Sequence, residues 1–203
     1  FCDAQTKKRS LFKKGNKLFS DSIYVESEIN YRKSLEQDQD FFKAKYNLAN
    51  SVFKQERYDE SESLYSAILN QSEVKEENNK VQYNLATSQL KQNKFNEAIE
   101  NYKKALELNK DYASAYNNLA TYYDDFGKYN EAIKNYDKAL KSNPEHLNAK
   151  NNLIHLLNYY KTNKTEDNPI LKANNEIQDI NLNIFKDDEI ITSNLSEFIK
   201  KCN

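Results

Sequence analysis

Apolar residues between positions 113 and 146 recur at every third or fourth position, which places them on one face of each of two successive helices. Gly127 separates the two sets, and glycine readily adopts the left-handed conformation that ends many helices. Pro144 ends the second helix, because proline cannot continue one. The pattern predicts an antiparallel helical hairpin. Its inward-facing positions are Tyr116, Leu119, Ala120 and Tyr123, then Ala132, Ile133, Tyr136, Ala139 and Leu140.

The same pattern occurs four times along the chain. Tyr31, Tyr65, Tyr102 and Tyr136 follow one another at intervals of 34, 37 and 34 residues. A fixed period of this size indicates stacked units, none of which can bury its apolar face alone. Each unit also has a small residue on both of its helices. These residues are Gly15, Ala49, Ala86 and Ala120 in the first helices, and Ser27, Ser61, Ala98 and Ala132 in the second helices.

This register resembles the tetratricopeptide repeat, in which paired small residues let the two helices approach closely. The resemblance implies an all-α fold, a right-handed superhelical solenoid of antiparallel helix pairs, and a non-catalytic role in binding other proteins. Two amphipathic segments near the C-terminus either cap the array or dock on a partner. The predicted boundaries are 1–7 for an N-terminal remnant, 8–41, 42–78 (with a short insertion), 79–112 and 113–146 for four repeats, 147–161 for the first helix of a partial repeat, and 162–203 for capping helices.

The composition agrees with a helical chain and argues against other classes of protein. Only two glycines and two prolines occur among 203 residues, so tight turns are rare. Thirty basic residues balance 31 acidic residues without a block of one sign, which argues against nucleic acid as a partner. No apolar run has the length of a membrane-spanning helix.

The first residues have the character of a processed chain. Methionine is absent, and Ala4 precedes a lysine-rich helix as a small residue precedes the mature part of a secreted protein. This interpretation predicts an extracytoplasmic protein, in the periplasm or at the inner membrane. The alternative is a boundary that says nothing about compartment, and it leaves a cytoplasmic or organellar location open. Cys2 and Cys202 lack the spacing of a disulfide framework or a zinc site.

Asparagine recurs on the first helix of each pair, which lines the groove in tetratricopeptide repeats. Asn47, Asn84, Asn118 and Asn152 occupy the same position in four successive units. An amide side chain carries donors and an acceptor, so a row of them can pair with the backbone of an extended peptide. The alternative is that asparagine is merely common at this position and contacts no ligand.

Aromatic and basic residues accompany this row in the first three units, whereas polar and acidic residues replace them in later units. The groove is therefore expected to be aromatic and basic toward the N-terminus, flanked by Arg9, and acidic at Asp124 and Asp125. Alternatively, the aromatic residues only pack neighbouring helices together. The predicted peptide-binding residues are Asn16, Asn47, Asn50, Asn84, Asn118, Asn152, Tyr46, Tyr83, Phe53, Lys43 and Lys80.

One known use of these repeats is a carboxylate clamp for the C-terminal tails of chaperones. Asn16, Asn47 and Lys80 match its positions, but Phe12 and Asn84 stand where the clamp has cations. Each missing charge-assisted bond is worth about 1.5–3 kcal/mol. We therefore expect no recognition of a terminal carboxylate.

No catalytic, metal or cofactor site is expected. His146 and His155 are nine residues apart, far round the helix from each other, and no cysteine or carboxylate cluster has the spacing of metal ligands. A glycine-rich phosphate loop is absent, and both thiols are terminal. The histidines are better explained as surface residues.

A narrower resemblance covers the first two units. The runs 15–19, 28–35 and 43–49 resemble BatC, the envelope-associated repeat proteins of the Bacteroides aerotolerance operons in Bacteroidota. That resemblance implies a secretory signal, an assembly or chaperone-like role in the envelope, and membrane-anchored von Willebrand A domain proteins as partners.

Two functions follow from these observations. In the first, the chain is a protein-interaction scaffold that binds a partner peptide or helix in its groove. In the second, it is a structural subunit of a larger complex, docked through its convex face and C-terminal helices.

Overall fold

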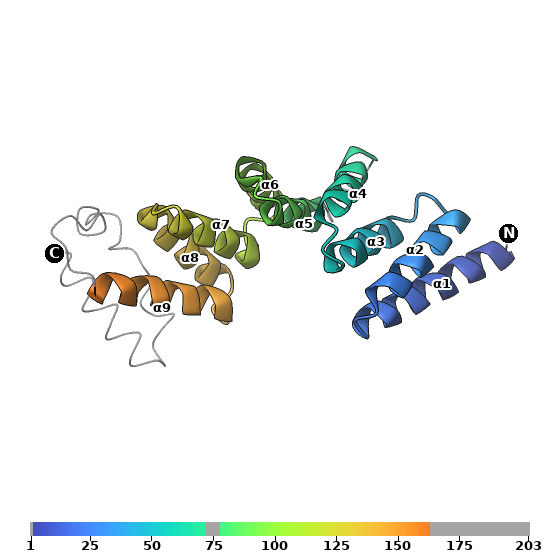
Figure 1. The fold of residues 1–203 in the computed structure, drawn as a ribbon, viewed down its shortest axis with the longest axis horizontal. Coiled ribbons are helices and arrows are strands. Elements are labelled where there is room, and N and C mark those ends of the chain that lie inside the picture. Colours follow the sequence, from blue (N-terminus) through green and yellow to red (C-terminus); the bar gives the residue numbers. More distant parts are fainter. Residues whose placement is uncertain (1, 72–77, 163–203) are drawn as a thin grey trace. The chain divides into compact units, whose positions relative to one another are not determined.

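Every element in the described part of the chain, residues 2–71 and 78–162 of a computed structural model, is an α-helix (Figure 1). The helices fall into two compact units, residues 1–108 and 109–203. Unit 1 contains α1 (Cys2–Ser20), α2 (Tyr24–Gln37), α3 (Phe42–Lys54), α4 (Tyr58–Gln71), α5 (Asn78–Lys91) and α6 (Phe95–Leu108). Unit 2 contains α7 (Ala113–Asp125), α8 (Tyr129–Ser142) and α9 (Leu147–Thr162). The predicted all-α class is confirmed.

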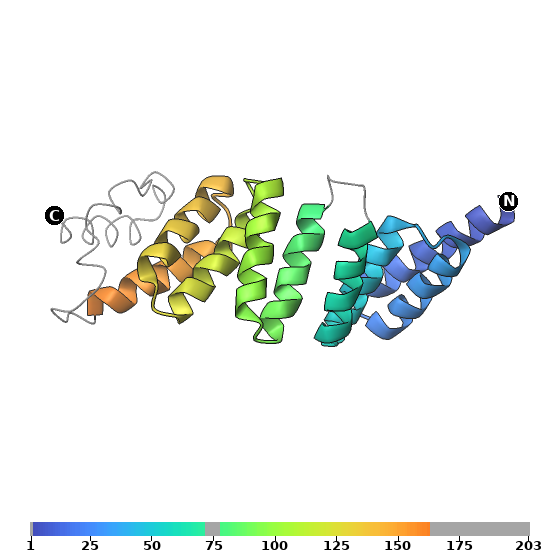
Figure 2. The same cartoon turned by 90° about the horizontal axis from the view of Figure 1, so that it is seen from above.

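Successive helices pair as antiparallel hairpins, α1 with α2, α3 with α4 and α5 with α6 in unit 1, and α7 with α8 in unit 2 (Figure 2). We call the first helix of each pair its A helix and the second its B helix. In unit 1, each A helix also contacts the A helix of the next pair. The paired arrangement is the one that the sequence period predicts.

The same turn joins A to B in every hairpin. After Tyr123 and Asp124, the backbone N–H of Lys128 donates to the Tyr123 carbonyl at 2.7 Å and that of Gly127 donates to the Asp124 carbonyl at 3.0 Å. These two bonds form a Schellman motif, which needs one residue in the left-handed conformation. Gly127 has φ 69°, as predicted, but the other three turns put a residue with a side chain there. Those residues are Ser22 (φ 60°), Glu56 (φ 62°) and Asn93 (φ 59°).

The core of unit 1 is built around one tyrosine from each B helix. Tyr31, Tyr65 and Tyr102 are at most 2% exposed. The small A-helix residues make room for these rings. A Cβ placed on Gly15 would lie 2.7 Å from a ring carbon of Tyr31, so this position has no space even for alanine.

Buried serines connect neighbouring repeats of unit 1. The Ser27 hydroxyl donates to the Gly15 carbonyl at 3.0 Å and lies 3.1 Å from the Ser51 hydroxyl. The Ser61 and Ser88 hydroxyls repeat this contact at 2.9 Å. Small side chains therefore permit close packing and also satisfy one another's hydrogen-bonding groups.

Unit 2 buries the positions that the sequence pattern predicts for its hairpin. Leu119, Ala120, Ala132, Ile133, Tyr136, Ala139 and Leu140 are buried, and Tyr116 and Tyr123 pack partly buried against them. On α9, Leu153, Leu156 and Leu157 are buried, and Ile154 packs partly buried against them.

His146 was expected to be a surface residue, but it is partly buried and contacts two neighbouring helices. Its Nδ1 accepts a hydrogen bond from the Ala149 backbone N–H at 3.2 Å, in the first turn of α9. Its Nε2 lies 3.3 Å from the Ser114 hydroxyl. His146 therefore caps α9 and ties it to α7, whereas His155 is exposed as expected.

One predicted repeat boundary differs from the structure, and two predicted segments lie outside the described residues. The helix expected from Lys8 begins at Cys2, so most of the predicted remnant 1–7 is helical. The insertion in the second repeat falls on residues 72–77, and the predicted capping helices fall after α9, so both lie outside the described residues. None of the helices that are described is long and apolar enough to cross a membrane.

Candidate functional site

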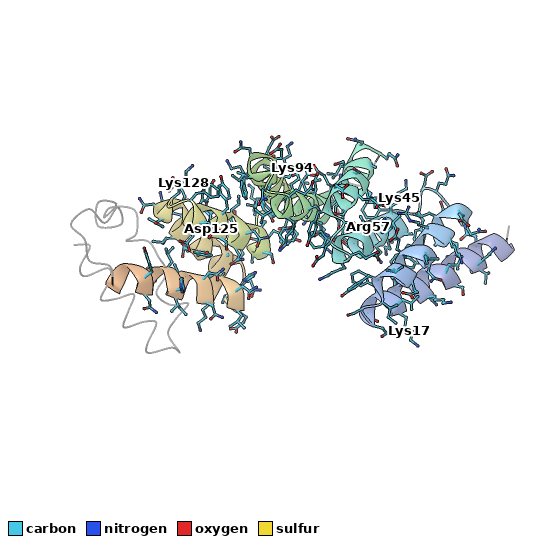
Figure 3. All side chains as sticks on the ribbon, in the orientation of Figure 1. Lys17, Lys45, Arg57, Lys94, Asp125 and Lys128 are labelled. Carbon is cyan, nitrogen blue, oxygen red and sulfur yellow. The ribbon has the colours of Figure 1, made fainter. Side chains whose placement is uncertain are left out.

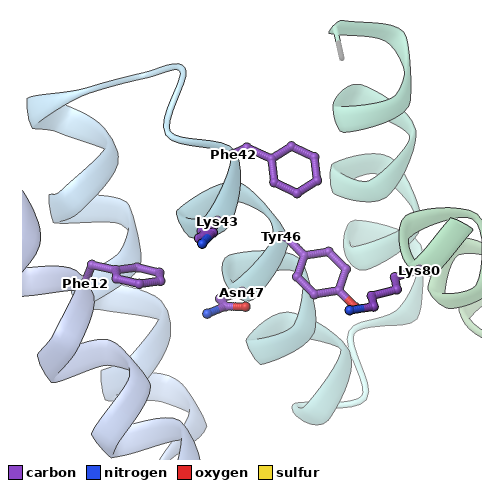
Figure 4. A pocket seen from close by; sticks show the side chains of 6 residues that line it. All are labelled: Phe12, Phe42, Lys43, Tyr46, Asn47 and Lys80. Atoms are coloured by element: carbon purple, nitrogen blue, oxygen red, sulfur yellow. The ribbon is translucent and has the colours of Figure 1, made fainter. Parts of the chain in front are cut away.

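Among the described residues of unit 1, two adjacent pockets lie along the A helices, and we call the surface that contains them the inner face. The first pocket has a volume of about 180 Å³ and the second about 280 Å³. The first lies at the N-terminal half of α3 and the second at its C-terminal half, and both reach α1 and α5. The first is lined by Phe12, Phe42, Lys43, Tyr46, Asn47 and Lys80 (Figure 4). The second is lined by Phe19, Asn50, Phe53, Lys54, Tyr65, Tyr83, Asn84 and Thr87.

The predicted site residues of the first three repeats thus come together. Asn47, Tyr46, Lys43 and Lys80 line the first pocket, and Asn50, Phe53, Tyr83 and Asn84 line the second. Asn16 is joined to them by a hydrogen bond from Asn47. The remaining two, Asn118 and Asn152, lie on α7 and α9 of unit 2.

The aromatic residues of the inner face also pack against the buried tyrosines. The ring centroids of Tyr46 and Tyr65 are 6.3 Å apart, and those of Tyr83 and Tyr102 are 5.6 Å apart. Phe12 makes the same contact with Tyr31 at 5.8 Å. Each of these rings therefore packs against the core in a tilted arrangement while the residue also lies at the inner face, so the two alternatives, groove and packing, coexist in one set of side chains.

The asparagines form bonds between successive repeats. The Tyr31 hydroxyl donates to Asn16 Oδ1 at 2.7 Å, and Asn47 Nδ2 donates to the same oxygen at 3.0 Å. Tyr31 belongs to the same repeat as Asn16, whereas Asn47 belongs to the next one. A single amide oxygen thus joins the core tyrosine of one repeat to the first helix of the following repeat.

The next repeat boundary has the same arrangement. The Tyr65 hydroxyl donates to Asn50 Oδ1 at 2.6 Å, and Asn84 Nδ2 donates to that oxygen at 2.9 Å. Asn84 Nδ2 is also 2.9 Å from the Tyr46 hydroxyl oxygen, to which it donates. Asn84 therefore directs both of its amide N–H groups, and Asn47 one of its two, to partners within the protein, and the amide oxygens of these two residues keep acceptor capacity for an incoming backbone.

Threonine replaces the accepting asparagine in later repeats. Thr87 Oγ1 is 3.0 Å from the Tyr102 hydroxyl, and in unit 2 Thr121 Oγ1 is 3.3 Å from the Tyr136 hydroxyl. Asn152 Nδ2 lies 3.4 Å from Thr121 Oγ1, a longer version of the asparagine bridge. Burial raises the pKa of Tyr136 to about 12, so this hydroxyl remains protonated at neutral pH.

Charge is divided between the two sides of unit 1, which the overall balance of the sequence conceals. Among the A helices, α1 has six lysines and arginines, α3 has three and α5 has two, and their one acid is Asp3. Each of the B helices α2, α4 and α6 has three acidic residues. Helices α2 and α6 have two basic residues each, and α4 has none. The inner face is therefore basic and the outer helices are acidic.

The outer acids are held in ion pairs that join neighbouring repeats. Glu28 on α2 accepts bonds from Gln55 and Arg57, both at 2.7 Å, and from Arg32 at 2.9 Å. Burial alone would raise the pKa of Glu28, but the bonds from Gln55 and Arg32 outweigh it and hold the pKa below its usual value. Lys94, like Arg57 at an A–B turn (Figure 3), pairs with Glu62 at 2.7 Å.

The lysines that line the two pockets differ from these in having no such partner, whereas Lys8 on α1 and Lys45 on α3 pair with Asp38 and Asp40. Lys43, Lys54 and Lys80 are exposed at the pockets, and no described residue forms an ion pair with any of them. Lys43 and Lys80 share one register position with Arg9 on α1, which is also exposed. Their charge is therefore available to a ligand.

The A helix α7 of unit 2 has the opposite character. It carries Asp124 and Asp125 at its C-terminal end and no basic residue (Figure 3). Burial, and then the neighbouring Asp125 carboxylate, raise the pKa of Asp124. The basic inner face is thus a property of unit 1.

Some pocket residues were not predicted. Phe42, Lys54 and Thr87 line the pockets but are not among the residues predicted from the sequence. Lys54 could have been found from its register, because Lys91 occupies the same position on α5. Phe42 gave no such signal, since it opens α3 at a position where α5 and α7 have small or polar residues.

The described residues give no sign of a metal centre. No group of three or more histidine, cysteine, aspartate or glutamate side chains among them could hold a metal ion. The clamp for a terminal carboxylate is also incomplete, since Phe12 lines the first pocket and Asn84 bonds to Asn50 where that clamp has cations.

Solved structures with the same fold are numerous and distant in sequence. A crystal structure of the MamA protein is 15% identical and has a TM-score of 0.63, over 97% of this chain and 90% of that chain. MamA from Desulfovibrio magneticus RS-1 is 16% identical, with a TM-score of 0.61 over 68% of this chain and 77% of that chain. YrrB, described as a tetratricopeptide repeat protein with an unusual peptide-binding site, is 21% identical, with a TM-score of 0.58 over 92% and 90%. No curated protein matches the chain.

Sequence models of one family cover the central part of the chain. One tetratricopeptide repeat model matches residues 40–111, and a second matches 83–140 and 117–157. Together they span 40–157, more than half of the 203 residues, which is the stretch from α3 through the hairpin of α7 and α8 into α9. The chain belongs to the tetratricopeptide repeat family.

Proposed function

We propose that this protein is a non-catalytic interaction scaffold whose inner face in unit 1 binds an extended segment of a partner protein. The observation that carries the proposal is the pair of adjacent pockets along α3. Each is smaller than the roughly 300–1,000 Å³ of a typical small-molecule site. Pockets of this size suit single side chains of a peptide better than a cofactor or metabolite.

The chemistry of the lining supports the same ligand. Phe12, Tyr46 and Phe53 offer apolar area, which anchors the side chains of a bound segment. Asn47 and Asn50 are half-buried beside them, where their amides can meet a peptide backbone. YrrB, a distant structural relative, is described as having a peptide-binding site of its own.

The test is selection of peptides from a random library on the immobilised protein, followed by binding to a variant with blocked pockets. Lys43→Trp combined with Lys54→Trp places an indole at the rim of each pocket. Both lysines are exposed, so the fold should tolerate the change. We expect selected peptides to lose at least about tenfold in affinity, because most binding energy comes from filled central pockets.

The matched control is Lys33→Trp combined with Lys103→Trp, on the B helices α2 and α6. These lysines are also exposed, so the pair loses the same charge and adds the same apolar area away from the inner face. The control should bind as wild type does. Equal losses in the two variants, or a library that yields no binder, would refute the proposal.

A second function is favoured by a different observation. Ile23, Val25 and Ile29 expose 42%, 54% and 45% of their surface around α2, on the outer side of unit 1. Such a group is a docking surface for a structural subunit of a larger complex. This alternative predicts that Val25→Ser plus Ile29→Ser, or deletion after Tyr160, releases the protein from its complex. Unchanged co-purification of both variants would contradict it.

We propose an envelope location, outside the cytoplasm, with von Willebrand A domain proteins as candidate partners, because the runs 15–19, 28–35 and 43–49 resemble BatC. Cell fractionation with an antibody against the native protein tests this. Recovery in the cytosol alone would rule it out.

A further inference from the structure

The inner face of unit 1 combines two features that together define a ligand. Lys43 and Lys80 are exposed at the first pocket and Lys54 at the second, and no described residue pairs with their charges. Aromatic side chains lie beside them in both pockets. The charged side chains that link neighbouring repeats elsewhere in unit 1 pair with each other, as Glu28 does with Arg57 at 2.7 Å.

We propose that the inner face selects acidic segments that carry aromatic or aliphatic anchors, and this inference rests on the function proposed above. Helices α3 and α5 contain five lysines and no acid, and one of the five, Lys45, pairs with Asp40 before α3, so an anionic segment at the pockets meets an excess of positive charge. The acids of unit 1 lie mainly on α2, α4 and α6. A basic segment would gain nothing at the inner face and would be drawn to the outer helices instead.

The pockets also fix the spacing of the anchors. Tyr46 and Phe53 mark the two pockets and are seven residues apart on α3. With a rise of 1.5 Å per residue, they are separated by about 10 Å along the helix. An extended chain covers about 3.3 Å per residue, so anchors about three residues apart would reach both pockets.

Acidic side chains, rather than a terminal carboxylate, supply the negative charge. Recognition of a terminus needs cations clustered around one point, whereas Phe12 and Asn84 interrupt such a cluster here. The lysines are instead distributed along both pockets. Internal segments of a partner are therefore as suitable as its C-terminus.

A polyanion such as single-stranded nucleic acid fits less well. The net charge of the chain is −1, so long-range attraction for a phosphate backbone is weak. Tyr46 and Tyr83 pack against the core residues Tyr65 and Tyr102 with interplanar angles of 58° and 55°, and these contacts hold their rings in place rather than leaving them free to stack on successive bases. The test nevertheless includes this ligand.

The experiment measures fluorescence anisotropy with labelled, C-terminally amidated peptides of the sequence Glu-Glu-Phe-Glu-Glu-Phe-Glu-Glu. Three matched probes replace every Glu by Gln, every Glu by Lys, or both Phe by Ala. We expect the acidic Phe peptide to bind at least about tenfold more tightly than each of the others, and to weaken as salt rises from about 50 to about 300 mM. A single-stranded oligonucleotide of equal charge should bind more weakly than this peptide.

Charge reversal on the protein provides the second arm. Lys43→Glu plus Lys80→Glu should abolish binding of the acidic probe, whereas Lys33→Glu plus Lys103→Glu, on the outer helices, should change it less than about twofold. The inference is overturned if the Gln or Lys probe binds equally well, if the oligonucleotide binds more tightly, or if both variants weaken binding alike. In those cases library-selected peptides still report on the proposed function separately, because the tryptophan variants block the pockets whatever the ligand's charge.

Discussion

Asn84 on α5 donates a hydrogen bond from Nδ2 to Oδ1 of Asn50 on α3, at 2.9 Å, across the boundary between two repeats. The Tyr65 hydroxyl donates to the same oxygen at 2.6 Å. This oxygen thus serves the core of one repeat and the first helix of the next. A row of asparagines that the sequence presents as a ligand surface is therefore also a connection between repeats.

Replacing Asn84 by Ala should lower the free energy of unfolding by about 1–2 kcal/mol, because the half-buried Asn50 and Tyr46 oxygens both lose a donor. Tyr65→Phe should cost less, about 0.5–1.5 kcal/mol, because Asn50 Oδ1 keeps its bond from Asn84. Urea unfolding followed by circular dichroism measures both. An Asn84→Ala protein as stable as wild type would show that the bridge contributes nothing. The same cost makes asparagine variants poor probes of ligand binding.

Gly15→Ala should destabilise unit 1 although alanine is the better helix former. The gain in helix propensity is about 1 kcal/mol. Against it, the new Cβ would lie 2.7 Å from the ring of Tyr31, which is 1% exposed and cannot move aside. Overpacking of this kind costs about 1–3 kcal/mol, so we expect a net loss of up to about 2 kcal/mol. A rise in the unfolding midpoint would mean that the ring moves freely.

Glu56→Gly should stabilise the protein by about 0.5–1 kcal/mol. Glu56 is exposed and has φ 62°, a conformation that glycine adopts without the steric cost of a Cβ. Gly127→Ala at the equivalent turn should do the opposite, by about 1 kcal/mol, since Gly127 has φ 69°. Thermal unfolding of the two variants against wild type measures both signs. Equal effects of the same sign would contradict the strain argument.

Acid should weaken unit 1 through Glu28 and Glu62. Burial acts to raise the pKa of both, but hydrogen bonds from Gln55 and Arg32 to Glu28, and from Lys94 and Gln89 to Glu62, hold them below the usual 4.5. A carboxyl whose folded pKa is depressed contributes stability above its unfolded pKa and loses it as pH falls through the folded pKa. We therefore expect unfolding free energy to fall below about pH 4.5.

The controls for this pH dependence are Glu28→Gln and Glu62→Gln. Each should lower the free energy of unfolding at pH 7 by about 1–2 kcal/mol, because glutamine pairs less strongly with Arg57 or Lys94. Each should also reduce the loss of stability below about pH 4.5, because glutamine does not titrate. Urea titrations between about pH 3 and pH 7 give both quantities. An unchanged acid limb in both variants would assign the effect to other carboxyls.

The hairpins and their core could be predicted from the sequence because each rests on a repeated local pattern. Tyr31, Tyr65, Tyr102 and Tyr136 are all buried, and Gly127 ends α7 as its residue type indicates. The turns at Ser22 and Glu56 could not be predicted in this way, because serine and glutamate rarely adopt the left-handed conformation, whereas asparagine, as at Asn93, is among the residue types that do.

The candidate site was predictable in position but not in pairing. Register alone brings Tyr46, Lys43 and Lys80 to one pocket. The hydrogen bond of Asn47 to Asn16, and the capping role of His146, depend on side-chain orientation between elements, which no sequence pattern reports. The separation of basic A helices from acidic B helices became evident only when each helix was assigned to the inner or outer side of unit 1.

The most direct test of the account is the site at which a library-selected peptide binds the isotopically labelled protein. Two-dimensional NMR spectra recorded during a titration report each backbone amide and the side-chain amides of Asn47, Asn50 and Asn84. If the peptide occupies the inner face, the largest shifts will occur in α1, α3 and α5 and in these side chains, with α2, α4 and α6 little changed. Shifts concentrated on the outer helices, or none at saturating peptide, would contradict it.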